Sequence, residues 1–94
     1  FPYTTLFRSY GIMQTGWQMV NGKWYYLNSV GAMQTGWILK EEKSYFLNAD
    51  GSMAIGWVNS QGIWYYFDQQ TGVMQTNTYV DDGRYVNAEG ALVP

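Results

Sequence analysis

The sequence predicts an all-β protein, a solenoid of stacked β-hairpins with about 20 residues in each repeat. A Gly-x-Met motif recurs at Gly11, Gly31, Gly51 and Gly72, at spacings of 20, 20 and 21 residues. A Gly-Trp pair and an aromatic run follow the motif in each of the first three copies. Fixed periods of this length are typical of repeat architectures.

Residues 1–9 precede the repeats and share no motif with them. They are a direct translation of TTT CCC TAC ACG ACG CTC TTC CGA TCT, a string that resembles a widely used sequencing-adapter oligonucleotide. We interpret this segment as an assembly artefact and exclude it from the fold prediction. The repeat module is expected over 10–94, with repeats at about 11–30, 31–50, 51–71 and 72–89 and a partial repeat at 90–94.

The first repeat predicts a hairpin with a two-residue loop at Asn21-Gly22, because tight hairpin turns need two residues that accept positive φ. That loop fixes the register, so that Trp17 faces Tyr26 and Met19 faces Trp24. Side chains alternate between the two faces of a strand. One face is therefore expected to carry Trp17, Met19, Trp24 and Tyr26, and the other Gln18, Val20, Tyr25 and Leu27.

The later repeats use other turn residues. Gln61-Gly62 is a weaker version of the same signal, whereas Glu41-Glu42 matches poorly and predicts a looser turn. The extra residue of the third repeat falls in the turn-like stretch 68–71, where insertions are tolerated. The fourth repeat is degraded, as terminal repeats commonly are, with Asn77-Thr78 in place of Gly-Trp. Asp82-Gly83 is expected to restore the tight turn there.

Composition excludes several classes of function. The five Lys and Arg are scattered and the net charge is −2, so the concentrated positive footprint of a nucleic-acid-binding protein is missing. The absence of Cys rules out disulfides and thiolate metal sites. No apolar run approaches the roughly 20 residues of a membrane span. With no His, no thiol and no serine beside a base, neither catalysis nor a cofactor or metal is expected.

Two runs carry a family resemblance: Gly-Ala-Met-Gln-Thr-Gly-Trp at 31–37 and Asn-Gly-Lys-Trp-Tyr-Tyr-Leu-Asn at 21–28. They resemble the choline-binding cell-wall repeats of Gram-positive bacteria and their phages. Clostridial toxin repeats and glucan-binding repeats share part of the pattern, but they usually lack a Trp at the positions of Trp24 and Trp64. The resemblance implies a secreted, surface-located and non-catalytic module that anchors to choline or phosphocholine on teichoic and lipoteichoic acids. Homodimers through the C-terminal hairpins occur in the family, and the degraded fourth repeat leaves both a monomer and a homodimer open for this chain. Any catalytic domain would lie upstream.

The resemblance further implies ligand cages between successive hairpins. In the family, a cage consists of the Gly-Trp tryptophan, the Trp of the Trp-Tyr-Tyr run and a tyrosine of the next repeat. Ser44 stands where the second cage needs its second Trp, and a two-residue deletion precedes the tyrosine of the third. The implied cages are Trp17, Trp24 and Tyr45; Trp37 and Tyr65; and Trp57, Trp64 and Tyr85.

Aromatic rings suit this ligand because a quaternary ammonium has no N–H to donate, while the face of a ring attracts a cation. Three rings together give about 4 kcal/mol after losses, which corresponds to an affinity on the order of millimolar. Two other interpretations stay open. In a carbohydrate-binding repeat the rings would stack on sugars, with polar side chains beside them. In a structural spacer they would only pack, and no ligand would bind.

Overall fold

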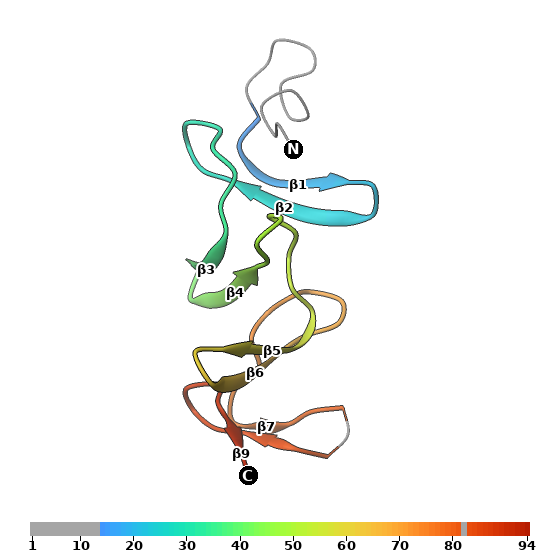
Figure 1. Ribbon diagram of the computed structural model, residues 1–94, viewed down its shortest axis with the longest axis vertical. Coiled ribbons are helices and arrows are strands. Elements are labelled where there is room, and N and C mark those ends of the chain that lie inside the picture. Colours follow the sequence, from blue (N-terminus) through green and yellow to red (C-terminus); the bar gives the residue numbers. More distant parts are fainter. Residues whose placement is uncertain (1–13, 82) are drawn as a thin grey trace. The chain divides into compact units, whose positions relative to one another are not determined.

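The computed structural model describes residues 14–81 and 83–94, and every regular element within them is a β-strand (Figure 1). The all-β fold predicted from the sequence is confirmed. Residues 1–9, interpreted above as an artefact, lie outside the described ranges. In the part that is described, no helix has the length and apolarity to cross a membrane. The strands are β1 (Gly16–Val20), β2 (Lys23–Leu27), β3 (Gly36–Lys40), β4 (Lys43–Leu47), β5 (Gly56–Ser60), β6 (Ile63–Phe67), β7 (Thr78–Tyr79), β8 (Tyr85–Val86) and β9 (Leu92–Val93).

Strands that follow one another in the chain pair with each other. Three two-stranded sheets, β1-β2, β3-β4 and β5-β6, are followed by the three-stranded sheet β7-β8-β9. The chain folds into two compact units, one made of Phe1–Gly36 and Leu47–Met53, the other of Trp37–Phe46 and Ala54–Pro94. The first unit holds hairpin β1-β2, and the second holds hairpin β5-β6 and the three-stranded sheet.

The register of the first hairpin is the predicted one. Trp17 pairs with Tyr26 and Met19 with Trp24, and Asn21-Gly22 forms the loop with φ of 52° and 82°. Of the two predicted faces, the one that carries Tyr25 and Leu27 is buried in its unit, with Val20 and Met33 packed against it. The opposite face therefore leaves its tryptophans nearer to the solvent.

The second turn is as tight as the first, so the prediction of a looser turn at Glu41-Glu42 is wrong. Only these two residues separate β3 from β4, and their φ angles are 53° and 67°. Neither residue favours positive φ. The rings of Trp37 and Phe46 nevertheless pack across the hairpin at 5.3 Å, and this contact favours the paired strands although the turn residues do not favour the turn.

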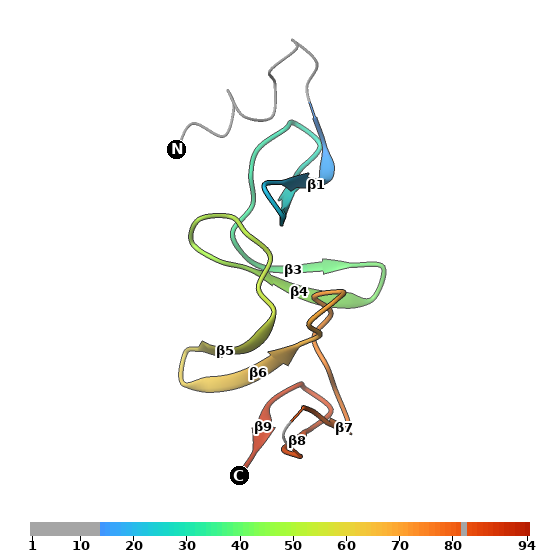
Figure 2. The ribbon, with the colours of Figure 1, turned by 90° about the vertical axis from the view of Figure 1, so that its right-hand side faces the viewer.

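The fourth repeat turns through three residues, so the predicted two-residue turn at Asp82-Gly83 is corrected. Tyr79 pairs with Tyr85, and the N–H of Val80 donates to the carbonyl of Arg84 at 2.8 Å, which leaves 81–83 as the loop. Asp82 itself lies outside the described residues. The shorter repeat gains a third strand, because β9 pairs with β8 (Figure 2).

A side-chain-capped loop follows each hairpin. Asn28 accepts backbone N–H groups from Val30 and Ala32 at 3.0 and 2.9 Å, and Asn87 repeats this pattern in the fourth repeat. Asp68 does the same in the third repeat, where backbone N–H donation from Thr71 and then Gln70 lowers the pKa of its carboxyl group. These caps satisfy backbone donors that the turn leaves without a strand partner.

Hydrogen bonds also reach beyond neighbouring repeats. In the first unit, the N–H of Met53 donates to the carbonyl of Trp24 at 2.7 Å. In the second unit, Met74 donates to the carbonyl of Ser44 at 2.8 Å, and Tyr65 forms a bridge with Ala91. The Gly-x-Met segments of the third and fourth repeats thus pair with the second strand of the hairpin two repeats earlier.

Candidate functional site

A pair of aromatic rings crosses every hairpin at the same register position. The centroids lie 5.0–5.3 Å apart, with the ring planes 66–76° from parallel. This edge-to-face geometry is a favoured aromatic arrangement, and it fixes the orientation of the first ring of each repeat. The pairs are Trp17–Tyr26, Trp37–Phe46, Trp57–Tyr66 and Tyr79–Tyr85.

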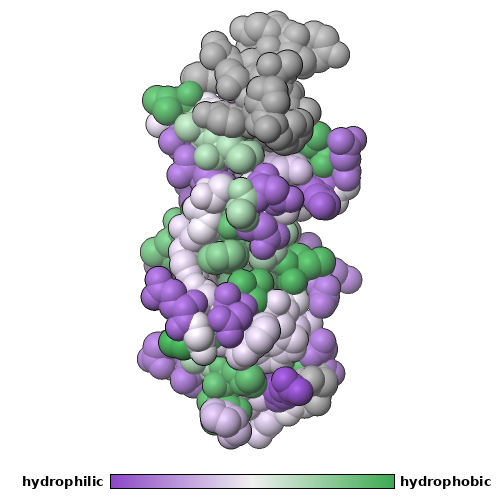
Figure 3. Space-filling model, in the orientation of Figure 1, coloured by the Kyte–Doolittle hydropathy of each residue, from purple (hydrophilic) through white to green (hydrophobic). Residues whose placement is uncertain are grey.

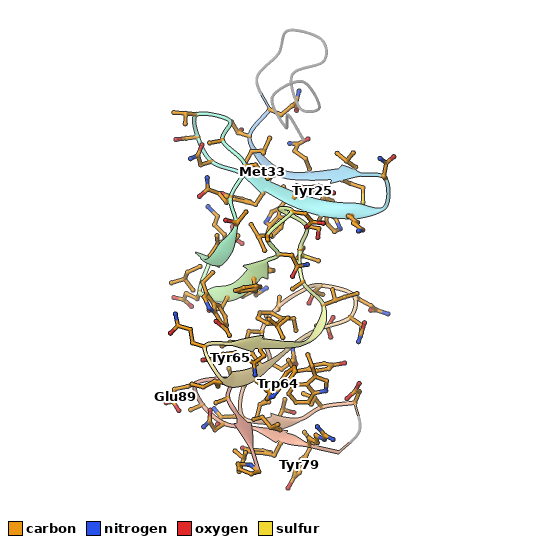
Figure 4. All side chains as sticks on the ribbon, in the orientation of Figure 1. Tyr25, Met33, Trp64, Tyr65, Tyr79 and Glu89 are labelled. Atoms are coloured by element: carbon orange, nitrogen blue, oxygen red, sulfur yellow. The ribbon has the colours of Figure 1, made fainter. Side chains whose placement is uncertain are left out.

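The second unit contains a pocket of about 320 Å³ lined by Trp57, Trp64, Arg84 and Leu92. Its two tryptophans share one face of hairpin β5-β6, because Trp57 pairs with Tyr66 and Asn59 with Trp64. Trp57 is half-buried, while Trp64 is exposed, and Figure 4 shows Trp64 beside Tyr65 on the same strand. Two of the residues predicted for the third cage therefore line one pocket.

Arg84 occupies the position in this pocket that the sequence analysis gave to Tyr85. The buried Val86, followed by Asn87, corresponds to Leu27 and Asn28 of the first repeat, since both apolar side chains are 1% exposed or less. Counting back from them aligns Tyr85 with Tyr26, and its ring packs on Tyr79 at 5.0 Å. Arg84 then aligns with Tyr25, and therefore with Tyr45 and Tyr65 of the second and third repeats.

The predicted residues of the second cage meet directly. The rings of Trp37 and Tyr65 lie 4.8 Å apart with an interplanar angle of 81°, so they form two walls at a right angle. Trp37 also packs against Phe67 at 5.7 Å, and its indole N–H donates to Ser60 Oγ at 3.2 Å. Ser44, at the position that Trp24 and Trp64 hold in the other repeats, offers no ring to this corner.

The residues of the first cage belong to different units. Trp17 and Trp24 lie in the first unit, on one face of hairpin β1-β2, whereas Tyr45 lies in the second. Trp24, Trp37 and Trp64 are 38, 42 and 46% exposed. Trp24 and Trp64 occupy equivalent positions on the second strands of their hairpins, whereas Trp37 lies on the first strand of its hairpin, like Trp17 and Trp57. Large aromatic side chains usually bury most of their area in a core, so the exposure of these three indoles indicates a surface role.

The surroundings of the tryptophans are weakly charged. Arg84 is the single formally charged residue among those that line the pocket. Across residues 14–81 and 83–94, no group of three or more His, Cys, Asp or Glu could hold a metal ion. On the face drawn in Figure 3, apolar surface is divided into small patches with hydrophilic residues between them. These features favour small-ligand pockets over a broad docking surface.

Four residues around these sites escaped the sequence analysis: Arg84, Leu92, Phe46 and Phe67. A signal for Arg84 was present in the sequence. Each repeat ends its aromatic run with an apolar residue and then Asn or Asp, and counting back from Val86-Asn87 places Arg84 on the tyrosine position. Leu92 carried no such signal, because β9 belongs to a repeat that is only partly present.

Comparison with known proteins agrees with this geometry. A family profile described as choline-binding repeat matches residues 14–55 and 40–79. Choline binding protein F from Streptococcus pneumoniae is 43% identical, with a TM-score of 0.79 over 86% of this chain and 27% of that one. The choline binding domain of Spr1274 from the same organism is 40% identical, with a TM-score of 0.78 over 86% of this chain and 96% of that domain.

A third structure is that of a pneumococcal cell wall endolysin from phage Cp-1 complexed with choline. It is 36% identical, with a TM-score of 0.65 over 84% of this chain and 24% of that one. No curated protein sequence matches the chain. The chain spans about a quarter of the length of choline binding protein F. These matches confirm the hairpin-solenoid fold class and the resemblance noted in the sequence.

Proposed function

This chain belongs to the choline-binding repeat family, and from that membership we propose that it is a non-catalytic module which binds choline groups on cell-wall polymers. The family and its structural relatives support cell-wall binding as the general function. The choice of teichoic and lipoteichoic acids as the polymers, and a secreted, surface-attached location, form part of the proposal.

The pocket between Trp57 and Trp64 carries the proposal. Two indole faces on one side of a hairpin supply the negative quadrupoles that a quaternary ammonium needs, and no carboxylate is required. A volume of about 320 Å³ lies at the lower end of the range for small-molecule sites. Leu92 gives the N-methyl groups an apolar contact. The pocket therefore suits a small organic cation with a hydrophobic surface.

The corner between Trp37 and Tyr65 supports a second, weaker site. Its two walls stand at right angles, but the indole N–H is already bonded to Ser60 and no ring replaces Ser44. Trp17 and Trp24, which share one face of hairpin β1-β2, are proposed as a third site by family resemblance. Several millimolar sites on one chain gain avidity of roughly 10²–10⁴ on a polymer that carries many choline groups.

A choline titration followed by tryptophan fluorescence tests this function, with sodium chloride at equal ionic strength as the reference. The wild-type chain should show a saturable change in the millimolar range. Trp64→Ala should weaken that response, because it removes an exposed wall of the pocket. Leu39→Ala removes an apolar side chain that is 69% exposed and does not line the pocket, so it should leave the response intact. A folded wild-type chain that gives no choline response would overturn the proposal.

The two alternative interpretations gain no comparable support. A sugar site would place neutral polar side chains beside the rings to bond hydroxyl groups, yet the pocket is lined by two Trp, one Leu and one Arg. A spacer would bury its large rings, whereas Trp24, Trp37 and Trp64 stay partly exposed. Repeating the fluorescence titration with soluble glycans separates these alternatives. A sugar site would respond to the glycans, and a spacer would respond neither to them nor to choline.

A further inference from the structure

The pocket of the second unit replaces an aromatic wall with a cation. Trp37 meets Tyr65 of the following repeat at 4.8 Å, and the corresponding partner of Trp57 is Arg84, which lines the pocket with it. Building on the proposed choline-binding function, we infer that this pocket selects the phosphocholine zwitterion over free choline. Arg84 is the residue that determines this preference, by recognising the phosphate.

The four residues that line the pocket form two groups, and each group suits one end of the ligand. Trp57 and Trp64 offer ring faces to the ammonium end, and Leu92 offers an apolar contact to its methyl groups. A guanidinium offers five N–H donors in a planar fork that matches a phosphate, whereas a tyrosine in the same place offers one O–H donor. The residues of the pocket thus complement both charges of a zwitterion joined by a short linker.

Arg84 is also expected to weaken the binding of free choline, which has no phosphate. Like charges within one small pocket repel each other, and this repulsion weakens the binding of free choline. With a phosphate present, the same guanidinium gains an ion pair. Exposed ion pairs change an equilibrium by up to about fivefold, and Arg84 is exposed. The expected preference for the zwitterion is therefore about fivefold, and it should shrink as ionic strength rises.

The preference can be measured at this pocket alone with the indole N–H signals of the full chain, labelled with ¹⁵N-tryptophan and assigned by single Trp→Phe substitutions. The signals of Trp57 and Trp64 report this pocket, separately from those of the other three tryptophans. The probes are choline, glycerophosphocholine and glycerol phosphate. In the wild-type chain, glycerophosphocholine should bind about fivefold tighter than choline, and glycerol phosphate should give the weakest response.

Substitutions then assign the preference to Arg84. Arg84→Gln should bring the two affinities within about a factor of two, and Arg84→Lys should keep only part of the preference, because a point charge replaces the fork. Lys43→Gln removes an equal charge from an exposed residue that does not line the pocket, so it should leave the ratio unchanged. Arg84→Tyr restores the family's aromatic wall and should make choline the better ligand.

Three outcomes would overturn the inference: equal affinities in the wild-type chain, an unchanged ratio in Arg84→Gln, or a response to glycerol phosphate as strong as that to glycerophosphocholine. In each case, choline-dependent shifts at any of the five tryptophans would leave the proposed function standing. Loss of every choline response would instead count against the proposed function itself.

Phosphocholine groups occur both on wall polymers and on choline lipids, and two further binding partners distinguish these sources. Purified choline-bearing cell walls and phosphatidylcholine vesicles are each mixed with wild-type chain and with Arg84→Gln. Weaker retention of Arg84→Gln on either partner supports phosphate recognition and identifies its source. Equal retention of both proteins on both partners would contradict it.

Discussion

Two of the glycines that open a repeat, Gly51 and Gly90, close over a methionine from the repeat before. A Cβ atom placed on Gly90 would lie 2.6 Å from Met74 Sδ, and one on Gly51 would collide with Met33 in the same way. Both glycines also have positive φ, of 83° and 90°. A methionine side chain therefore fills the space beside the glycine of the next repeat, and glycine leaves that space because it has no Cβ atom.

Gly51→Ala should lower the free energy of unfolding by about 2–3 kcal/mol, because it adds overpacking to the conformational cost of a left-handed residue. Gly22→Ala is the matched control: φ is 82°, but no atom lies within 4 Å of the added Cβ. It should cost about 1 kcal/mol. Urea denaturation measures both values, and equal losses for the two variants would show that Met33 moves aside without penalty.

At this scale the sequence predicts the kind of residue better than its exact position. The tryptophans of the pocket could be identified because their spacing follows the repeat. Counting forward from the third repeat across a two-residue deletion predicts Tyr85 as the cage residue, whereas the pairing of Tyr79 with Tyr85 and the lining of the pocket place Arg84 there instead. A deletion shifts register, and register decides which side chain faces a site.

The hairpins show how packing overrides local preference. Three hairpins share a two-residue turn with positive φ at both positions, although the loop residues differ: Asn21-Gly22, Glu41-Glu42 and Gln61-Gly62. Only the first is an ideal choice for that turn. The aromatic pairs that cross the strands are common to all three and hold the register. The strands and the first turn could therefore be predicted from sequence, but the second turn could not.

Replacing Glu41-Glu42 with Asn-Gly should stabilise the chain by about 1–2 kcal/mol, because both residues then accept the left-handed conformation without strain. Thermal unfolding measures the gain. The reciprocal change, Asn21-Gly22 to Glu-Glu, should lower the free energy of unfolding by a similar amount. It adds two negative charges, whereas the first variant removes two, so the pair of variants separates the effect of turn conformation from that of net charge. A neutral outcome in both variants would mean that turn conformation contributes little to stability.

At the scale of the chain, hydrogen bonds join repeats that are two apart, at Trp24–Met53 in the first unit and at Ser44–Met74 in the second. The repeat period could be read from the sequence, but these partners could not, because nothing in the motif says which strand a Gly-x-Met segment will extend. The partial last repeat illustrates the same point. It becomes strand β9, completes a sheet and contributes Leu92 to the pocket.

Ligand binding should stabilise the whole chain, because the pockets exist only when the hairpins are folded. For one site with a millimolar dissociation constant, about 100 mM choline contributes roughly 2.7 kcal/mol. In a chain of this size that raises Tm by roughly 10–20 °C. Differential scanning calorimetry with choline chloride against sodium chloride measures the rise. Equal Tm values in the two salts would argue against specific binding.

The central claim is that tryptophan pockets attach the chain to choline-bearing cell walls, and co-sedimentation with purified walls tests it most directly. The wild-type chain should sediment with the walls and be released by millimolar choline, but not by sodium chloride of equal ionic strength. A Trp57→Ala/Trp64→Ala chain should be retained at least tenfold less, because avidity depends on several sites acting together. Unchanged retention of that variant, or release by soluble glycans rather than by choline, would contradict the account.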